Sequence, residues 1–90
     1  MKKIKLTRAN KSILLKALAP YYYQERELGH STQELGRLIL KINSLPADKK
    51  ATFSTEEIFL MRTTINRLRN ERLVKGQYTD AADDMLLKLF

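Results

Sequence analysis

Residues 53–75 read FSTEEIFLMRTTINRLRNERLVK and carry the signals of one long helix. Ser54 or Thr55 is a favourable N-cap, and Glu57 stands three residues after Ser54, which is the spacing of a capping box. Gly76 follows the stretch and readily takes the left-handed conformation that closes a helix. The apolar side chains recur at helical spacing on one face. They are Ile58, Met61, Ile65 and Leu68.

A second long helix is predicted from Thr7, its candidate N-cap, to about residue 28. Its apolar face combines Leu14, Leu18 and Tyr21 with Ile13 and Ala17. Pro20 interrupts this pattern, because proline removes one helical hydrogen bond and clashes with the preceding turn. We therefore expect either a kink near Ala17 or a helix that ends by Ala19 and restarts at Pro20.

Each long helix is followed by a glycine and by a shorter apolar pattern. After Gly29, a candidate N-cap at residues 31–32 precedes a helix that Pro46 stops. After Gly76, a candidate N-cap at residues 79–80 begins the last helix. The two apolar faces are Leu35, Leu38, Ile39 and Ile42 in the first short helix, and Ala82, Met85, Leu86 and Leu89 in the second.

The two long–short pairs form a repeat. Residues 6–43 align with residues 53–90 at an offset of 47 without a gap, so that caps, apolar faces and turn glycines coincide. Packing two such hairpins together buries both apolar faces. No segment alternates apolar and polar residues over a useful length, so no sheet is expected. The prediction is an all-α, four-helix domain of two tandem hairpins, 7–45 and 54–90, joined by a polar linker at 46–53.

Composition narrows the class of protein. The 90 residues carry a net charge of +7, with +6 in residues 1–45 and +1 in residues 46–90. An acidic surface or a phosphate backbone would therefore meet the first half. The chain has no cysteine, which excludes disulfides and fits a reducing cytoplasm. No apolar run approaches the length of a membrane span, so a cytoplasmic protein is expected.

The sequence favours a protein without catalytic activity, cofactor or metal. His30 is the single histidine and follows a turn glycine, which is typical of a solvated loop residue. Asp80, Asp83 and Asp84 are better explained by a helix N-terminus, which favours negative charge, than by a calcium site. The three glycines are far apart and form no phosphate-binding loop.

One set of candidate binding residues is basic. Lysines and arginines at the start of the chain form an arm that suits phosphate contacts, and arginine and asparagine on the central helix suit base edges. Tyr22 and Tyr23 would stack on unpaired bases. The candidate nucleic-acid contacts of the arm are Lys2, Lys3, Lys5, Arg8 and Lys11.

A second set suits a protein partner, because tyrosine and arginine are enriched at interface hot spots. Three adjacent tyrosines cannot all be buried, since successive helix residues are about 100° apart. The candidate partner-binding residues are Tyr22, Tyr23, Arg26, Arg62, Asn66 and Arg69. Pairing of two copies through such a patch is a further expectation.

The segments YYYQERELGHSTQELGRLILKI and GQYTDAADDMLLKLF combine a capped helix, a Gly-x-x-Thr turn and a short leucine-rich helix. In this the chain resembles small helical-hairpin accessory proteins of bacteriophages and mobile elements of Gram-positive bacteria. The resemblance implies direct binding to a host or defence protein, with a regulatory or inhibitory effect, in the cytoplasm of a bacterium or bacterial host cell. Nucleic-acid binding through the basic arm and helix arginines is the alternative.

Overall fold

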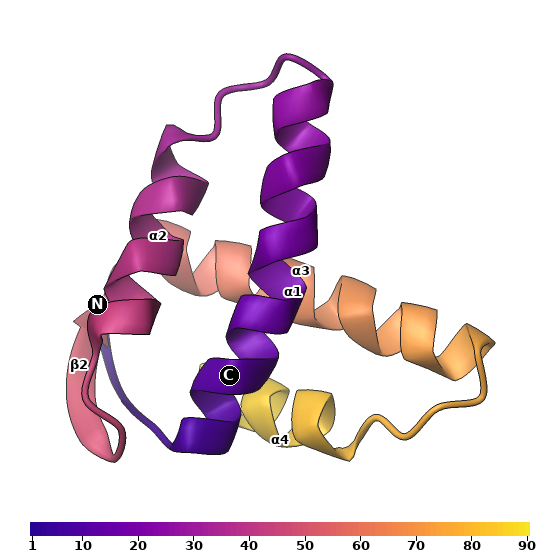
Figure 1. Ribbon diagram of the computed structural model, residues 1–90. Coiled ribbons are helices and arrows are strands. Elements are labelled where there is room, and N and C mark those ends of the chain that lie inside the picture. Colours follow the sequence, from indigo (N-terminus) through magenta and orange to yellow (C-terminus); the bar gives the residue numbers. More distant parts are fainter.

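The computed structural model describes residues 1–90, and the chain runs through two β-α-α units (Figure 1). The first unit consists of β1 (Lys2–Leu6), α1 (Arg8–Glu27) and α2 (Gln33–Ser44). The second unit consists of β2 (Lys49–Phe53), α3 (Thr55–Val74) and α4 (Asp80–Leu89). The four expected helices are present.

The expectation of a purely helical fold without a sheet is wrong. The N-terminal arm is strand β1, and most of the linker at 46–53 is strand β2; the two pair as an antiparallel ribbon. Each strand has only five residues, which is too short for period-two alternation to stand out. Strand pairing also depends on a partner far away in the sequence, and no local pattern displays that partner.

The two long helices begin in the same way. The Thr7 hydroxyl accepts from the Asn10 N–H, and the Asn10 side chain accepts from the Thr7 N–H. Ser54 and Glu57 form the same reciprocal pair at α3, as the spacing predicted. These capping boxes fix the point at which each strand turns into its helix.

Of the two alternatives predicted at Pro20, the break is wrong, because α1 continues through Pro20 as one helix. The kink near Ala17 stays a prediction. Pro20 is exposed on α1, so its ring faces solvent. Packing of α1 against α2, α3 and α4 holds the helix together on both sides of the proline. In Figure 1, α2 stands beside α1, and α3 crosses behind it.

The two units repeat the same order of elements at a constant offset in the sequence. Lys49, Thr55 and Asp80, the first residues of β2, α3 and α4, each lie 47 residues after the first residue of β1, α1 or α2. The turn glycines Gly29 and Gly76 take φ values of 77° and 69°. The offset that aligned the helices thus also relates the strands, and we call residues 47 positions apart counterparts.

One apolar core joins the two units. Both strands and all four helices contribute to it, so neither unit buries its apolar side chains alone. Its members are Ile4, Leu6, Ile13, Leu14, Ala17, Leu18, Leu35, Leu38, Ile42, Phe53, Met61, Ile65, Ala82, Met85 and Leu89.

Candidate nucleic-acid interface

The ribbon has one apolar face and one basic face. Ile4, Leu6 and Phe53 are buried, which seats the ribbon on the helices. Successive strand residues point to opposite faces, so the intervening side chains face outward. The outer face consists of Lys3, Lys5, Lys50 and Thr52, all exposed.

The outer face concentrates positive charge without compensation. The two strands contain five lysines and no acidic residue. Lys5 lies directly opposite Lys50 in the ribbon, and Lys3 lies opposite Thr52. Like charges at directly opposed positions destabilise a strand pair. The Lys5–Lys50 pair therefore opposes folding.

The ribbon is held to the helices by two equivalent lysines. Lys41 of α2 donates to the Thr52 carbonyl at 2.7 Å and to both carboxylate oxygens of Glu57 at 3.0 and 3.1 Å. Lys88 of α4, its counterpart, donates to the Lys5 carbonyl at 3.1 Å and to Asn10 Oδ1 at 2.5 Å. The lysine of each short helix thus binds both the strand and the capping box of the other unit.

The Glu57 carboxylate is charged as part of this anchor. Burial raises its pKa, but hydrogen bonds from the Ser54 backbone and the Lys41 ammonium outweigh that effect and hold the pKa below its ordinary value. The Lys41 ammonium also lies 4.5 Å from the centre of the Phe53 ring. The inner edge of the ribbon is therefore a rigid, fully paired environment.

The structure gathers part of the predicted basic arm on this ribbon. Lys3 and Lys5 project from the outer face, and Arg8 is exposed in the first turn of α1. Lys2 instead donates to the Phe90 carbonyl. Lys11 donates to the carbonyls at the end of α2, so its ammonium serves an intramolecular contact.

Lys49, Lys50 and Thr52 were absent from the predicted site. They lie in the segment that was interpreted as a linker. Extending the 47-residue alignment upstream would have revealed them, because Lys2-Lys3 falls on Lys49-Lys50.

Two of the predicted partner-binding residues join the helices of their own unit. The Tyr22 ring packs over Gly36 of α2, and the Arg69 Nε lies 2.5 Å from Asp83 Oδ1 of α4. Tyr22 and Arg69 are counterparts, as are Gly36 and Asp83, so each unit joins its helices at this position by different chemistry. The Arg69 hydrogen bond also lowers the pKa of Asp83.

The remaining predicted partner-binding residues are distributed over separate surfaces. Arg62 lies over the Phe90 ring at 4.0 Å. Tyr23 is 61% exposed and meets Tyr22 edge to face. Arg26 and Asn66 are exposed. The structure therefore leaves Tyr23, Arg26 and Asn66 accessible and brings Tyr23 into contact with Tyr22.

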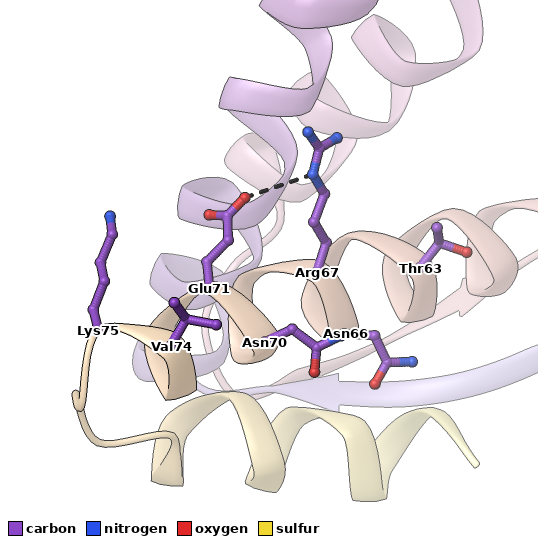
Figure 2. A pocket seen from close by; sticks show the side chains of 7 residues that line it. All are labelled: Thr63, Asn66, Arg67, Asn70, Glu71, Val74 and Lys75. Atoms are coloured by element: carbon purple, nitrogen blue, oxygen red, sulfur yellow. Dashed lines mark ion pairs between the residues drawn. The ribbon is translucent and has the colours of Figure 1, made fainter.

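Two surface hollows adjoin these residues. Figure 2 shows a polar hollow along α3, where the Arg67–Glu71 ion pair stands beside Asn66. All its lining residues belong to α3 or its C-cap, so it is a stretch of helix surface. A smaller hollow of about 270 Å³ lies between α1 and α2 and is mainly apolar. Its lining residues are Ala19, Tyr22, Tyr23, Gly36, Ile39 and Leu40.

Four ion pairs join titratable side chains within the molecule. His30 bonds to Glu25 at the exposed turn after α1, and this hydrogen bond lowers the pKa of Glu25. No group of three or more His, Cys, Asp or Glu side chains is placed to hold a metal ion. The absence of catalytic activity and cofactor stays a prediction from the sequence.

Two further findings concern the chain as a whole. None of its helices combines the length and the apolar character needed to cross a membrane. Comparisons with protein-family models, with curated proteins and with solved structures find nothing that matches this chain.

Proposed function

We propose that this protein binds double-stranded DNA and inserts the outer face of its ribbon into the major groove. The proposal rests on the outer face of the antiparallel ribbon. Lys3, Lys5 and Lys50, three of the five lysines in the strands, lie on this face, and neither strand contains an acidic residue. The major groove of B-DNA admits a two-stranded β-ribbon. Lys3, Lys5 and Lys50 would then meet base edges and phosphates.

The surroundings of the ribbon favour this docking. Arg8 follows β1 in the first turn of α1, where it would reach a phosphate beside the groove. Lys41 and Lys88 hold the strand backbones to the helices. The ribbon would therefore lose little backbone entropy on binding.

The test is a fluorescence-anisotropy titration of labelled duplex DNA at about 50 mM and about 200 mM salt. Affinity should fall steeply with salt, because lysine–phosphate contacts release counterions. Lys3→Ala/Lys5→Ala/Lys50→Ala should weaken binding by more than about tenfold, since a lysine–guanine contact contributes about 1–3 kcal/mol. Lys16→Ala/Arg37→Ala/Lys75→Ala is the matched control, because it removes three exposed positive charges from the helices.

Equal loss of affinity in both triple variants would show a nonspecific charge effect and argue against the ribbon. Absence of duplex binding at the lower salt concentration would remove the proposal.

A second candidate function is binding to a protein partner, and the apolar hollow between α1 and α2 favours it. Tyr23 and Leu40 at this hollow are 61% and 70% exposed. In the other unit the counterparts of Ala19, Tyr22 and Tyr23 are Asn66, Arg69 and Asn70, whereas those of Ile39 and Leu40 are Leu86 and Leu87. The long-helix side of the hollow is therefore apolar in the first unit only. In line with the resemblance to phage accessory proteins, the partner would be a host or defence protein that is regulated or inhibited.

Capture from a bacterial lysate tests this second candidate. Tyr23→Ala/Leu40→Ala should lose a partner that wild type retains. Phe59→Ala/Leu73→Ala removes two other exposed apolar side chains and should keep it. Equal recovery by both double variants would exclude the hollow as the binding surface.

A further inference from the structure

The register of the antiparallel ribbon gives it a local twofold axis at its middle pair. Ile4 pairs with Ala51, the residue 47 positions after it, and the other pairs are arranged symmetrically about this one. Lys2 pairs with Phe53 at one end, and Leu6 pairs with Lys49 at the other. Rotation about the axis therefore exchanges the two strands and leaves the ribbon in register.

The side chains on the outer face follow this symmetry at one position and break it at the other. Lys3 and Lys50 are counterparts and are identical. Lys5 and Thr52 are counterparts and differ in charge and length. One side of the axis consequently presents the opposed pair Lys5 and Lys50, and the other side presents Lys3 and Thr52.

From this we infer that a single chain recognises an imperfect inverted repeat in duplex DNA, an inference that rests on the proposed DNA-binding function. Lysine bonds to the O6 and N7 atoms of guanine, whereas threonine bonds to several bases or contacts the thymine methyl group. Lys3 and Lys50 select guanine at equivalent positions of the two half-sites. Lys5 selects a second guanine in one half-site only, because Thr52 occupies the equivalent position in the other.

The covalent link between the units sets the stoichiometry. Proteins that read inverted repeats as dimers mirror the symmetry of their site through two identical chains. Here both halves of the reading surface belong to one chain, and one core joins them. A single copy therefore covers the whole site and can hold two unequal half-sites in a fixed orientation.

Selection from a pool of randomised duplexes, with wild type and Thr52→Lys, tests the inference. Wild type should enrich an inverted repeat with one shared guanine per half-site and a second guanine in one half-site only. Thr52→Lys should enrich the symmetric version with the second guanine in both half-sites. The backbone contact between Lys41 and the Thr52 carbonyl does not depend on the side chain at position 52.

Ser31→Lys is the matched control, because it adds the same charge at an exposed position in the turn after α1, at the opposite end of that helix from β1. It should enrich the same imperfect repeat as wild type. Light scattering on the selected duplex should give one chain per site.

Three outcomes overturn the inference while leaving DNA binding intact: a wild-type consensus without inverted symmetry, a perfectly symmetric wild-type consensus, or an unchanged consensus for Thr52→Lys. Two chains on each selected site would overturn the single-copy stoichiometry. Absence of any duplex binding by wild type at low salt would instead refute the proposed function, and the inference with it.

Discussion

At the scale of single residues, the ribbon combines side chains that stabilise the fold with side chains that oppose it. Lys41 and Lys88 each satisfy a strand carbonyl and a capping-box side chain. The side chains of Lys5 and Lys50, in contrast, face each other across the two strands. The first pair of lysines is explained by the fold. The second pair has no role in the fold, and it belongs to the face through which we propose that the protein binds DNA.

Lys50→Glu should separate stability from binding. The substitution replaces a repulsive cross-strand pair with an attractive one, so the free energy of unfolding should rise by about 0.2–1 kcal/mol. Affinity for duplex DNA should fall. Urea unfolding and anisotropy measure the two quantities, and Lys16→Glu on the exposed face of α1 is the control for the change in net charge. Lower stability of Lys50→Glu than of Lys16→Glu would contradict the expected repulsion.

Glu57 should make stability depend on pH. Its pKa is lower in the folded chain than the ordinary value of 4.5, so its charged form stabilises the fold. That contribution is complete above the ordinary value and is lost as the pH falls through the folded pKa. Glu57→Gln should therefore lower Tm at neutral pH and reduce the fall in Tm between about pH 6 and about pH 3.

Thermal unfolding followed by circular dichroism gives these Tm values. Glu56→Gln is the control, because Glu56 is exposed on the same first turn of α3. The carboxylates of Glu25 and Asp83, whose pKa values are also lowered, are present in both variants and cancel in the comparison. Identical pH profiles for the two variants would show that the Lys41–Glu57 contact contributes nothing measurable.

At the scale of elements, local signals and tertiary packing compete, and packing prevails. Pro20 is a helix breaker by its chemistry, yet α1 runs through it. The Lys16 carbonyl lacks its helical donor there, because proline has no N–H. α1 packs against three other helices, and this packing keeps it helical across Pro20. The strands have weak local signals, and a two-stranded ribbon alone is marginally stable in water. Their pairing therefore depends on packing against the helices.

Pro20→Ala should stabilise the protein, because it restores the donor to the Lys16 carbonyl and removes the ring from the preceding turn. A gain of about 1–3 kcal/mol in the free energy of unfolding is expected. Chemical denaturation measures it, with Ser12→Ala as a control at another exposed position of α1. A loss of stability would mean that the proline ring contributes packing that alanine does not replace.

At the scale of the whole molecule, the two units are interlocked. The ribbon takes one strand from each unit, and the anchoring lysine of each short helix binds the strand and cap of the other unit. The buried side chains of both units form a single cluster. Each unit alone would expose the apolar face that the other covers, and its strand would have no partner.

Separate fragments 1–45 and 46–90 should therefore be largely unfolded in isolation and should regain helical structure when mixed. Short helices without tertiary packing are only marginally stable in water, and an unpaired strand contributes no hydrogen bonds that would stabilise the fragment. Far-UV circular dichroism of each fragment and of the equimolar mixture measures the effect. A monomeric, fully helical fragment 1–45, shown by light scattering, would contradict the interlocked core.

Sequence alone predicted the features that depend on neighbours within one helical turn. The capping box of Ser54 and Glu57, the left-handed glycines and the apolar faces of all four helices follow from spacings of three and four residues. The 47-residue repeat was also visible in the sequence, because caps and stripes recur in order. These signals are local, so no knowledge of the fold was needed to interpret them.

Only the tertiary structure decided which side chains share a surface and which are occupied within the molecule. The strand pair joins residues about half the chain apart, and it is this pairing that brings Lys5 beside Lys50. Packing likewise assigns Tyr22 to Gly36 and Arg69 to Asp83, which no periodicity within one helix could show. A spacing specifies the face of a helix on which a residue lies, whereas contact with a distant segment specifies whether that residue is free to bind.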